Sequence, residues 1–125
     1  MNNDNVNDPE YWINMAFSLT KQGKDDLAKK YYQKVIELDP DNVAALINWA
    51  KAAKPPEFQQ AKAYLSHALE IDKNSVEALI NLGVIYDDEG NRDEALKCYT
   101  NALELDPSRP EIWHNRGLLY SFPTI

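Results

Sequence analysis

The stretch from residue 76 to residue 107 constrains the fold most, because it holds two apolar stripes with helical spacing on either side of a glycine turn. The first stripe contains Leu79, Leu82, Gly83 and Tyr86, and the second contains Ala95, Tyr99 and Ala102. Apolar residues that recur every three or four positions are typical of a helix with one buried face. Gly90 can adopt the left-handed conformation that ends a helix, and Asn91 can cap the next one, with Glu94 three residues later. The stretch therefore predicts a helical hairpin.

The hairpin resembles the tetratricopeptide repeat (TPR), a 34-residue unit with the pattern W-x2-L-G-x2-Y, A-x3-F and a closing proline. The corresponding residues here are Leu79, Leu82, Gly83, Tyr86, Ala95, Tyr99, Ala102 and Pro107. The small residues Gly83, Ala95 and Ala102 fall where two antiparallel helices approach most closely, so larger side chains would separate the helices. The resemblance implies an all-α fold, a right-handed superhelical solenoid of antiparallel helix pairs with about seven helices.

The same pattern divides the remaining chain. We expect a flexible N-terminal tail over residues 1–8, TPR 1 over 9–42, TPR 2 over 43–75, TPR 3 over 76–109, a terminal capping helix or half repeat over 110–122, and a tail over 123–125. In TPR 1 the signature residues are Trp12, Met15, Ala16, Leu19, Ala28, Tyr32, Val35 and Pro40, with Gly23 at the turn. Asp8 and Pro9 predict the cap and first position of its first helix.

TPR 2 departs most from the pattern. It has 33 residues, its turn carries Lys54-Pro55-Pro56 in place of a glycine, and Lys73 replaces the closing proline. Since proline disfavours helix in the preceding residue, the first helix should end near Ala53 or Lys54. Pro56 can then be an early residue of the second helix. We expect a reshaped turn around an unchanged core.

The terminal helix matches the pattern at Trp113, Gly117 and Tyr120, but no second helical pattern follows. Its apolar end therefore has two interpretations. The residues can pack back onto TPR 3 as a cap, or they can form an apolar end that self-associates into a homodimer or that once continued into more repeats. The residues of this self-association patch are Leu118, Leu119, Tyr120, Phe122 and Ile125.

Composition narrows the function classes. The chain has 125 residues, 44% hydrophobic and 26% charged, and a net charge of −7, which disfavours nucleic-acid binding. No segment has the length of an apolar membrane span, and the first residues do not resemble a secretion signal. Cys98 is the single cysteine, so no internal disulfide can form. We expect a cytoplasmic protein that binds neither nucleic acid nor membrane.

The sequence offers little for catalysis. His67 and His114 lack the spacing of a metal site, and no phosphate-binding loop, nucleophile elbow or dinucleotide fingerprint occurs. Cys98 lies beside Tyr99 on a predicted helix, where a small packed residue is expected. We therefore expect no enzyme activity, no cofactor and no metal; a catalytic role for Cys98 or His114 is the remaining alternative.

In the TPR family, the inner face of the first helices lines a concave groove that holds peptides, so the resemblance implies the site residues. Counted within each repeat, the fifth place holds isoleucine or histidine, the sixth holds asparagine, and the ninth is mostly apolar. The predicted groove residues are Ile13, Asn14, Phe17, Ile47, Asn48, Lys51, Ile80, Asn81, Val84, His114, Asn115 and Leu118. The isoleucines can contact a ligand or pack against the neighbouring first helix.

The asparagines at one register resemble the ladder by which the TPR array of O-GlcNAc transferases contacts a peptide backbone; alternatively, they bond to adjacent helices. The carboxylate clamp of chaperone-binding TPR domains is not reproduced, since only Asn48 matches it and Glu77 stands where the clamp has a lysine. Acidic residues near the rim favour an apolar peptide with basic flanks: Glu10, Glu77, Asp87, Asp88 and Glu111. We thus expect a non-catalytic scaffold or adaptor, or alternatively a homo-oligomerising unit.

Overall fold

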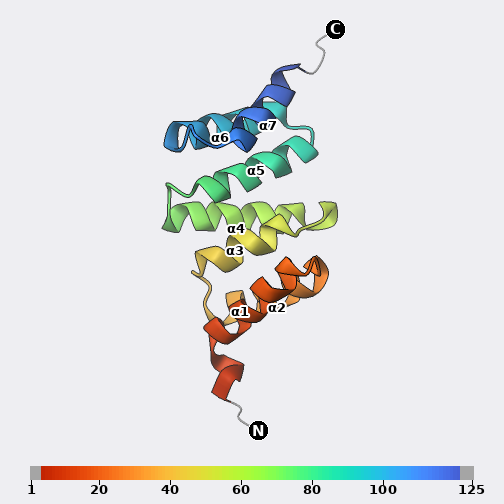
Figure 1. The fold of residues 1–125 in the computed structure, drawn as a ribbon, viewed down its shortest axis with the longest axis vertical. Coiled ribbons are helices and arrows are strands. Elements are labelled where there is room, and N and C mark those ends of the chain that lie inside the picture. The colour runs from red at the N-terminus through yellow and green to blue at the C-terminus, as the bar shows by residue number, and fades with distance from the viewer. Residues whose placement is uncertain (1–3, 122–125) are drawn as a thin grey trace. The chain divides into compact units, whose positions relative to one another are not determined.

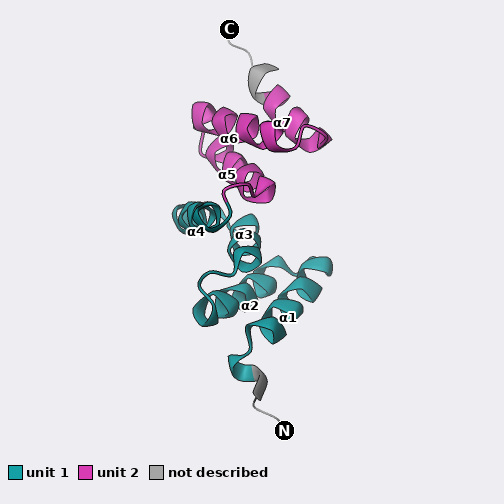
Figure 2. Ribbon diagram, turned by 90° about the vertical axis from the view of Figure 1, so that its left-hand side faces the viewer, with its two compact units in different colours: residues 1–72 teal, residues 73–125 magenta. Residues whose placement is uncertain are grey.

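The computed structural model describes residues 4–121, which form α-helices and short 3-10 helices without any strand in that range. Figure 1 follows the helices in chain order. The chain divides into two compact units, residues 1–72 and residues 73–125, coloured separately in Figure 2. The all-α fold built from helix pairs, predicted from the sequence, is confirmed.

The first unit contains two helix pairs. They are α1 (Pro9–Lys21) with α2 (Asp25–Leu38), and α3 (Val43–Lys51) with α4 (Phe58–Ile71). The Asp8 side chain caps α1 by accepting from the Glu10 backbone N–H at 3.0 Å, as predicted. Gly23 takes a φ of 75° between α1 and α2, a conformation that favours glycine. Of the TPR 1 signature side chains, Ala16, Ala28 and Tyr32 are buried, and so is Val35, although it is larger than the usual residue, whereas Met15 is 38% exposed.

A short 3-10 helix, η1 (Asp4–Asn7), precedes α1. The indole Nε1 of Trp12 donates to the carbonyl of Val6 at 3.0 Å and holds this turn against the helix. The sequence predicted a flexible tail over residues 1–8; residues 4–7 of it form this 3-10 turn, and residues 1–3 lie outside the described part.

The turn of the second pair is reshaped by its prolines. Helix α3 ends at Lys51, slightly before the predicted stop, and Ala53 N–H still bonds back to the carbonyl of Ala50 at 3.1 Å. Pro55–Glu57 then forms the 3-10 helix η2 before α4 begins at Phe58. Pro56 is therefore part of a 3-10 turn and not of the α-helix.

The second unit contains α5 (Val76–Asp88), α6 (Arg92–Leu105) and α7 (Pro110–Ser121). Gly90 has a φ of 82°, and the Asn91 side chain accepts from Glu94 N–H at 3.4 Å, which confirms the predicted turn and cap. The α5–α6 contact is tightest at Gly83, where an added Cβ would lie 2.6 Å from Cε1 of Tyr99. Helix α7 packs on α6 and buries Ile112 completely.

Candidate functional site

The sixth-place asparagines of α3 and α5 make the same contact. Asn48 Nδ2 donates to the carbonyl of Ala44, and Asn81 Nδ2 donates to the carbonyl of Glu77, each at 2.8 Å. Both side chains are half-buried. The bond is to the residue's own helix and not to an adjacent one. One N–H is satisfied in this way, while Oδ1 and the second N–H of each amide make no hydrogen bond to any described residue and can accept from and donate to a ligand.

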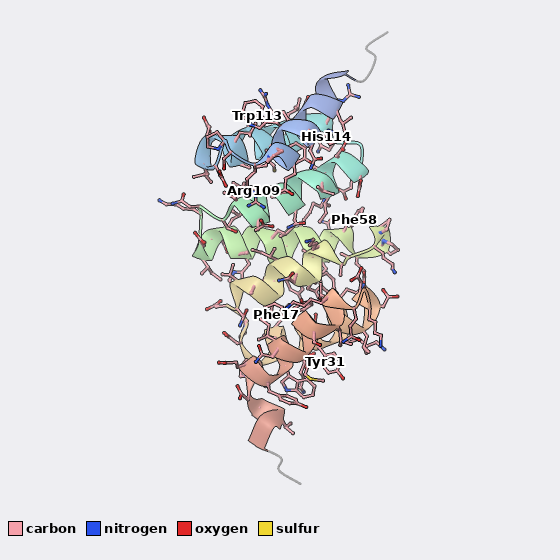
Figure 3. The ribbon with its side chains drawn as sticks, in the orientation of Figure 1. Phe17, Tyr31, Phe58, Arg109, Trp113 and His114 are labelled. Carbon is pink, nitrogen blue, oxygen red and sulfur yellow. The ribbon has the colours of Figure 1, made fainter. Side chains whose placement is uncertain are left out.

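The other two asparagines differ in exposure. Asn14 on α1 is exposed and Asn115 on α7 is half-buried. His114, next to Asn115, is exposed as well and is labelled in Figure 3. The hydrogen bond from an asparagine side chain to the carbonyl four residues earlier is therefore shared by α3 and α5, the first helices of TPR 2 and TPR 3.

The predicted apolar groove residues separate into two groups. The fifth-place isoleucines Ile13, Ile47 and Ile80 are 8%, 9% and 8% exposed, so they belong to the core and offer almost no surface. The ninth-place side chains are accessible: Phe17, Val84 and Leu118 are 37%, 36% and 47% exposed, and Lys51 is exposed too. Phe17 is labelled in Figure 3. Apolar contacts to a ligand must come from this second group.

Two depressions of the first unit contain predicted site residues. One of about 120 Å³ is lined by Thr20, Asp25, Asn48, Lys51 and Ala52. The other, of about 500 Å³, is lined by Asp8, Pro9, Glu10, Ile13, Asn14, Asp39 and Asn42. Both contain carboxylates next to an asparagine, a combination suited to a peptide backbone with a nearby cationic side chain.

The acidic rim is weaker in the second unit than composition suggested. Arg109 bonds through Nη2 to the carboxylates of both Glu77 and Glu111, the second at 2.6 Å. These two carboxylates are thus largely compensated. Asp87 and Asp88 remain exposed at the end of α5. Partial desolvation, and then the neighbouring Asp87 carboxylate, raise the pKa of Asp88.

A depression of about 640 Å³ on the first unit was not foreseen. It is lined by Asp26, Lys29, Lys30, Gln33, Trp49 and Glu57. Lys29 lies 5.7 Å from the centroid of the Trp49 ring and forms an ion pair with Glu57. The pairing with Glu57 depends on the Pro-Pro turn, which no repeat pattern describes. Its lysines face two carboxylates, so the hollow carries no net charge.

The thiol of Cys98 is not activated. Burial raises the pKa of the Cys98 thiol to about 11, so the thiolate that a nucleophile requires is scarce at neutral pH. His67 bonds through its ring to the Asp41 carboxylate at 2.8 Å and the Glu70 carboxylate at 3.3 Å. Within the described range, His, Cys, Asp and Glu side chains form no group that could hold a metal ion.

Two further predictions concern self-association through the C-terminal end and the ability of a helix to cross a membrane. In the proposed self-association patch, Leu118 is exposed, whereas the side chains of Leu119 and Tyr120, and the residues Phe122 and Ile125, lie outside the described part. The homodimer stays a prediction. Among residues 4–121, no helix combines the length and the apolar run that crossing a bilayer requires.

Comparison with known proteins connects this architecture to a family. The family model described as the tetratricopeptide repeat matches residues 9–42 and 76–109, which together make up more than half of the chain. These segments are the predicted first and third repeats, and the match leaves out residues 43–75, where the Pro-Pro turn lies.

Solved structures agree in fold. The TPR domain of Arabidopsis OM64 has 24% sequence identity and a TM-score of 0.84, over 95% of this chain and 99% of that one. The first TPR of Spaghetti (RPAP3), bound to the HSP90 peptide SRMEEVD, has 23% identity and a TM-score of 0.81, over 92% of each chain. YrrB, a TPR protein with an unusual peptide-binding site, has 22% identity and a TM-score of 0.80, over 87% of this chain and 57% of that one.

Proposed function

Because the chain belongs to the tetratricopeptide repeat family, we propose that it is a non-catalytic protein-interaction module, a scaffold or adaptor. It binds an extended peptide segment of a partner protein along the inner face of its first helices. The structural neighbours RPAP3 and YrrB, one solved with a bound peptide and one with a peptide-binding site, support binding of this kind.

The observation that carries the proposal is the shared geometry of Asn48 and Asn81. Each amide is fixed by one bond to its own helix, so its remaining acceptor and donor have a defined direction before a ligand arrives. A peptide unit presents one N–H and one C=O, which match that pair. Preorganised polar groups lose less conformational entropy on binding than mobile ones do.

The exposed apolar side chains supply the remaining affinity. Burying Phe17 or Val84 against a ligand would contribute about 1.5–3 kcal/mol each, whereas each asparagine hydrogen bond nets about 0.5–1.5 kcal/mol. The apolar contacts therefore set the strength of binding, and the amides set the register of the peptide.

The charge pattern specifies the ligand further. Asp8, Glu10 and Asp39 line the depression of about 500 Å³ on the first unit, and Asp87 is exposed on the second. The ligand is accordingly an apolar segment with basic flanks. A peptide ending in acidic residues, such as the SRMEEVD segment bound by the RPAP3 domain, should bind poorly, because the lysines of a carboxylate clamp are replaced here by Ile13 and Glu77.

The decisive experiment captures a partner with the wild-type chain, maps the bound segment, and measures its affinity by titration calorimetry. The Asn48→Ala/Asn81→Ala double variant should bind about five- to hundredfold more weakly, the sum of two such hydrogen bonds. Asn101→Ala is the matched control, since Asn101 is an exposed asparagine on α6, away from the first helices. Equal affinity of the double variant and the control would rule out peptide binding by these amides.

Self-association through the apolar C-terminal end is the alternative function, favoured by the exposure of Leu118. Light scattering over a range of protein concentrations separates the two, because a peptide-binding module stays monomeric without its ligand. A dimer that dissociates on Leu118→Asp substitution would support the alternative.

A further inference from the structure

Helix α7 has a face, formed by Trp113 and Gly117, that no described helix covers. It is distinct from the proposed peptide-binding face of α7, which carries Leu118. Trp113 is 51% exposed, while Leu46 and Leu79, which hold the same place on α3 and α5, are 1% and 8% exposed. Trp113 is labelled in Figure 3. Gly117 is exposed too, although the residue at its place on α3, Ala50, is 2% exposed. In every other helix pair of the described chain, this face is covered by the second helix of the repeat.

The surroundings of the two helical glycines differ sharply. A Cβ atom added to Gly83 would lie 2.6 Å from the ring of Tyr99 on α6, so glycine there permits a close helix contact. A Cβ atom added to Gly117 would meet no described atom within 4 Å. Glycine inside a helix is less favourable than alanine, so a glycine at this place serves α7 only when something approaches it.

An apolar hollow of about 290 Å³ adjoins this face. It is lined by Thr100, Leu103, Glu104, Pro107, Trp113 and Arg116. Leu103, Pro107 and Trp113 give it an apolar floor, and Arg116 Nε donates to Thr100 Oγ1 at 3.3 Å on its edge. The hollow thus lies at the junction of α6 and α7.

The first unit shows what covers the equivalent junction of α2 and α3. Gln33 and Trp49 hold the repeat places of Thr100 and Arg116. Helix α4 lies over them, with Tyr64 Oη donating to Gln33 Oε1 at 3.1 Å and the Tyr64 ring edge-on to Trp49 at 5.0 Å. The described chain therefore shows the kind of element that covers this face, a second helix packed on a first one, as α4 packs on α3 and α6 on α5. Both are amphipathic helices with small residues at the contact.

We propose that the face of α7 formed by Trp113 and Gly117, together with the adjoining hollow, docks an amphipathic helix of a partner protein. That helix carries the pattern small-x3-aromatic-x2-small, as Ala95, Tyr99 and Ala102 do on α6. Its aromatic ring lies on Gly117 as Tyr99 lies on Gly83, and its outer edge covers Trp113. A second copy of this chain cannot supply such a helix while folded, because Tyr32, Leu65 and Tyr99 are at most 1% exposed.

The test uses a peptide of the α6 sequence, residues 91–107, as the probe for the partner helix. Cys98→Ser removes its thiol, and a lactam between Asp93 and Lys97, both on the exposed side of α6, keeps the short peptide helical. Titration into the full ¹⁵N-labelled chain should shift the Trp113 indole and Gly117 amide resonances in a saturable way. A Tyr99→Ala version of the peptide should bind about tenfold more weakly or worse.

Gly117→Leu in the full chain should weaken binding by about tenfold or more, because the side chain occupies the place of the aromatic ring. The variant folds, since nothing described lies within 4 Å of its Cβ and leucine is a good helix former. Asn101→Ala, on the exposed side of α6 and outside both the hollow and the peptide-binding residues, is the control and should change the affinity by less than about twofold.

Three results would overturn the proposal. The first is the absence of shifts at Trp113 and Gly117 up to about 1 mM peptide. The second is equal binding of the Tyr99→Ala peptide. The third is concentration-dependent shifts of Trp113 without any peptide, which would assign the face to a second copy. Since this face excludes Asn48 and Asn81, their alanine variants leave it intact, and the failure of either proposal is distinguishable from that of the other.

Discussion

The ring of Tyr99 lies on the backbone of Gly83, at a distance that leaves no room for a side chain: a Cβ atom would be 2.6 Å from Cε1. Burial, and then the Asp87 and Asp88 carboxylates, raise the pKa of the Tyr99 hydroxyl well above its ordinary value. The α5–α6 pair depends on this contact.

Gly83→Ala should lower the free energy of unfolding by about 1–3 kcal/mol, the usual cost of overpacking a core. Urea denaturation measures the difference. Gly117→Ala is the matched control, because its Cβ meets nothing described and alanine favours helix, so this variant should gain about 0.5–1 kcal/mol. Similar changes in the free energy of unfolding for Gly83→Ala and Gly117→Ala would contradict this difference between the two glycine sites.

Glu57→Gln should reduce stability at neutral pH and flatten the loss of stability in acid. The Lys29 ammonium, followed by the Lys54 backbone N–H, lowers the pKa of Glu57 below its ordinary value of 4.5. A carboxyl with a lowered folded pKa stabilises the fold above its unfolded pKa, and that stabilisation disappears as the pH falls through the folded pKa. Urea midpoints at about pH 7 and pH 3 should therefore differ less in the variant. Glu37→Gln, on the exposed side of α2, should keep the wild-type difference.

His67→Gln should remove a loss of stability that occurs as the pH rises above about 6.5. Hydrogen bonds to Asp41 and then Glu70 raise the pKa of His67 above its ordinary value of 6.5. The charged ring stabilises the fold fully below the unfolded pKa, and this stabilisation is lost as the pH rises through the higher folded pKa. Thermal melting should show the wild type weakening above about pH 6.5, and His67→Gln should not follow it. His114→Gln retains His67 and should behave like the wild type.

Cys98 should resist thiol reagents until the protein unfolds. Its side chain is 7% exposed, and burial raises its pKa to about 11. Ellman's reagent should react slowly at pH 8 in buffer and rapidly in urea, with a rate in partial denaturant that follows unfolding. Fast reaction in the native protein would show that α6 opens locally, and it would revive the thiol as a candidate nucleophile.

The sequence predicted the first and third helix pairs well because those repeats contain their own signals. Gly23 and Gly90 mark turns, Asp8 and Asn91 mark helix starts, and small residues mark the close contacts. These are local features, and local features can be recognised one segment at a time. Helix α7 was also foreseen, through Trp113 and Gly117.

The prediction was weaker where a side chain can lie on either of two helix faces, or where it pairs with a residue that is distant in the sequence. The fifth-place isoleucines read as groove residues but are buried, because a helix between neighbours has apolar contacts on both sides. Glu77 and Glu111 read as rim charges, whereas Arg109 pairs with both. The turn at Pro55 depends on Asp26 and Lys29, about thirty residues earlier, which no short pattern contains.

The turn at Pro55 affects how the first unit unfolds. Lys54 reaches back to Asp26 at 2.9 Å, and Glu57 to Lys29, so the connection inside one repeat is fastened to the outer helix of the repeat before it. A repeat array usually frays from its ends, one module at a time. Here the first module is tied to its successor at a point away from their packed helices, and the two should exchange their amide protons as a single cooperative block.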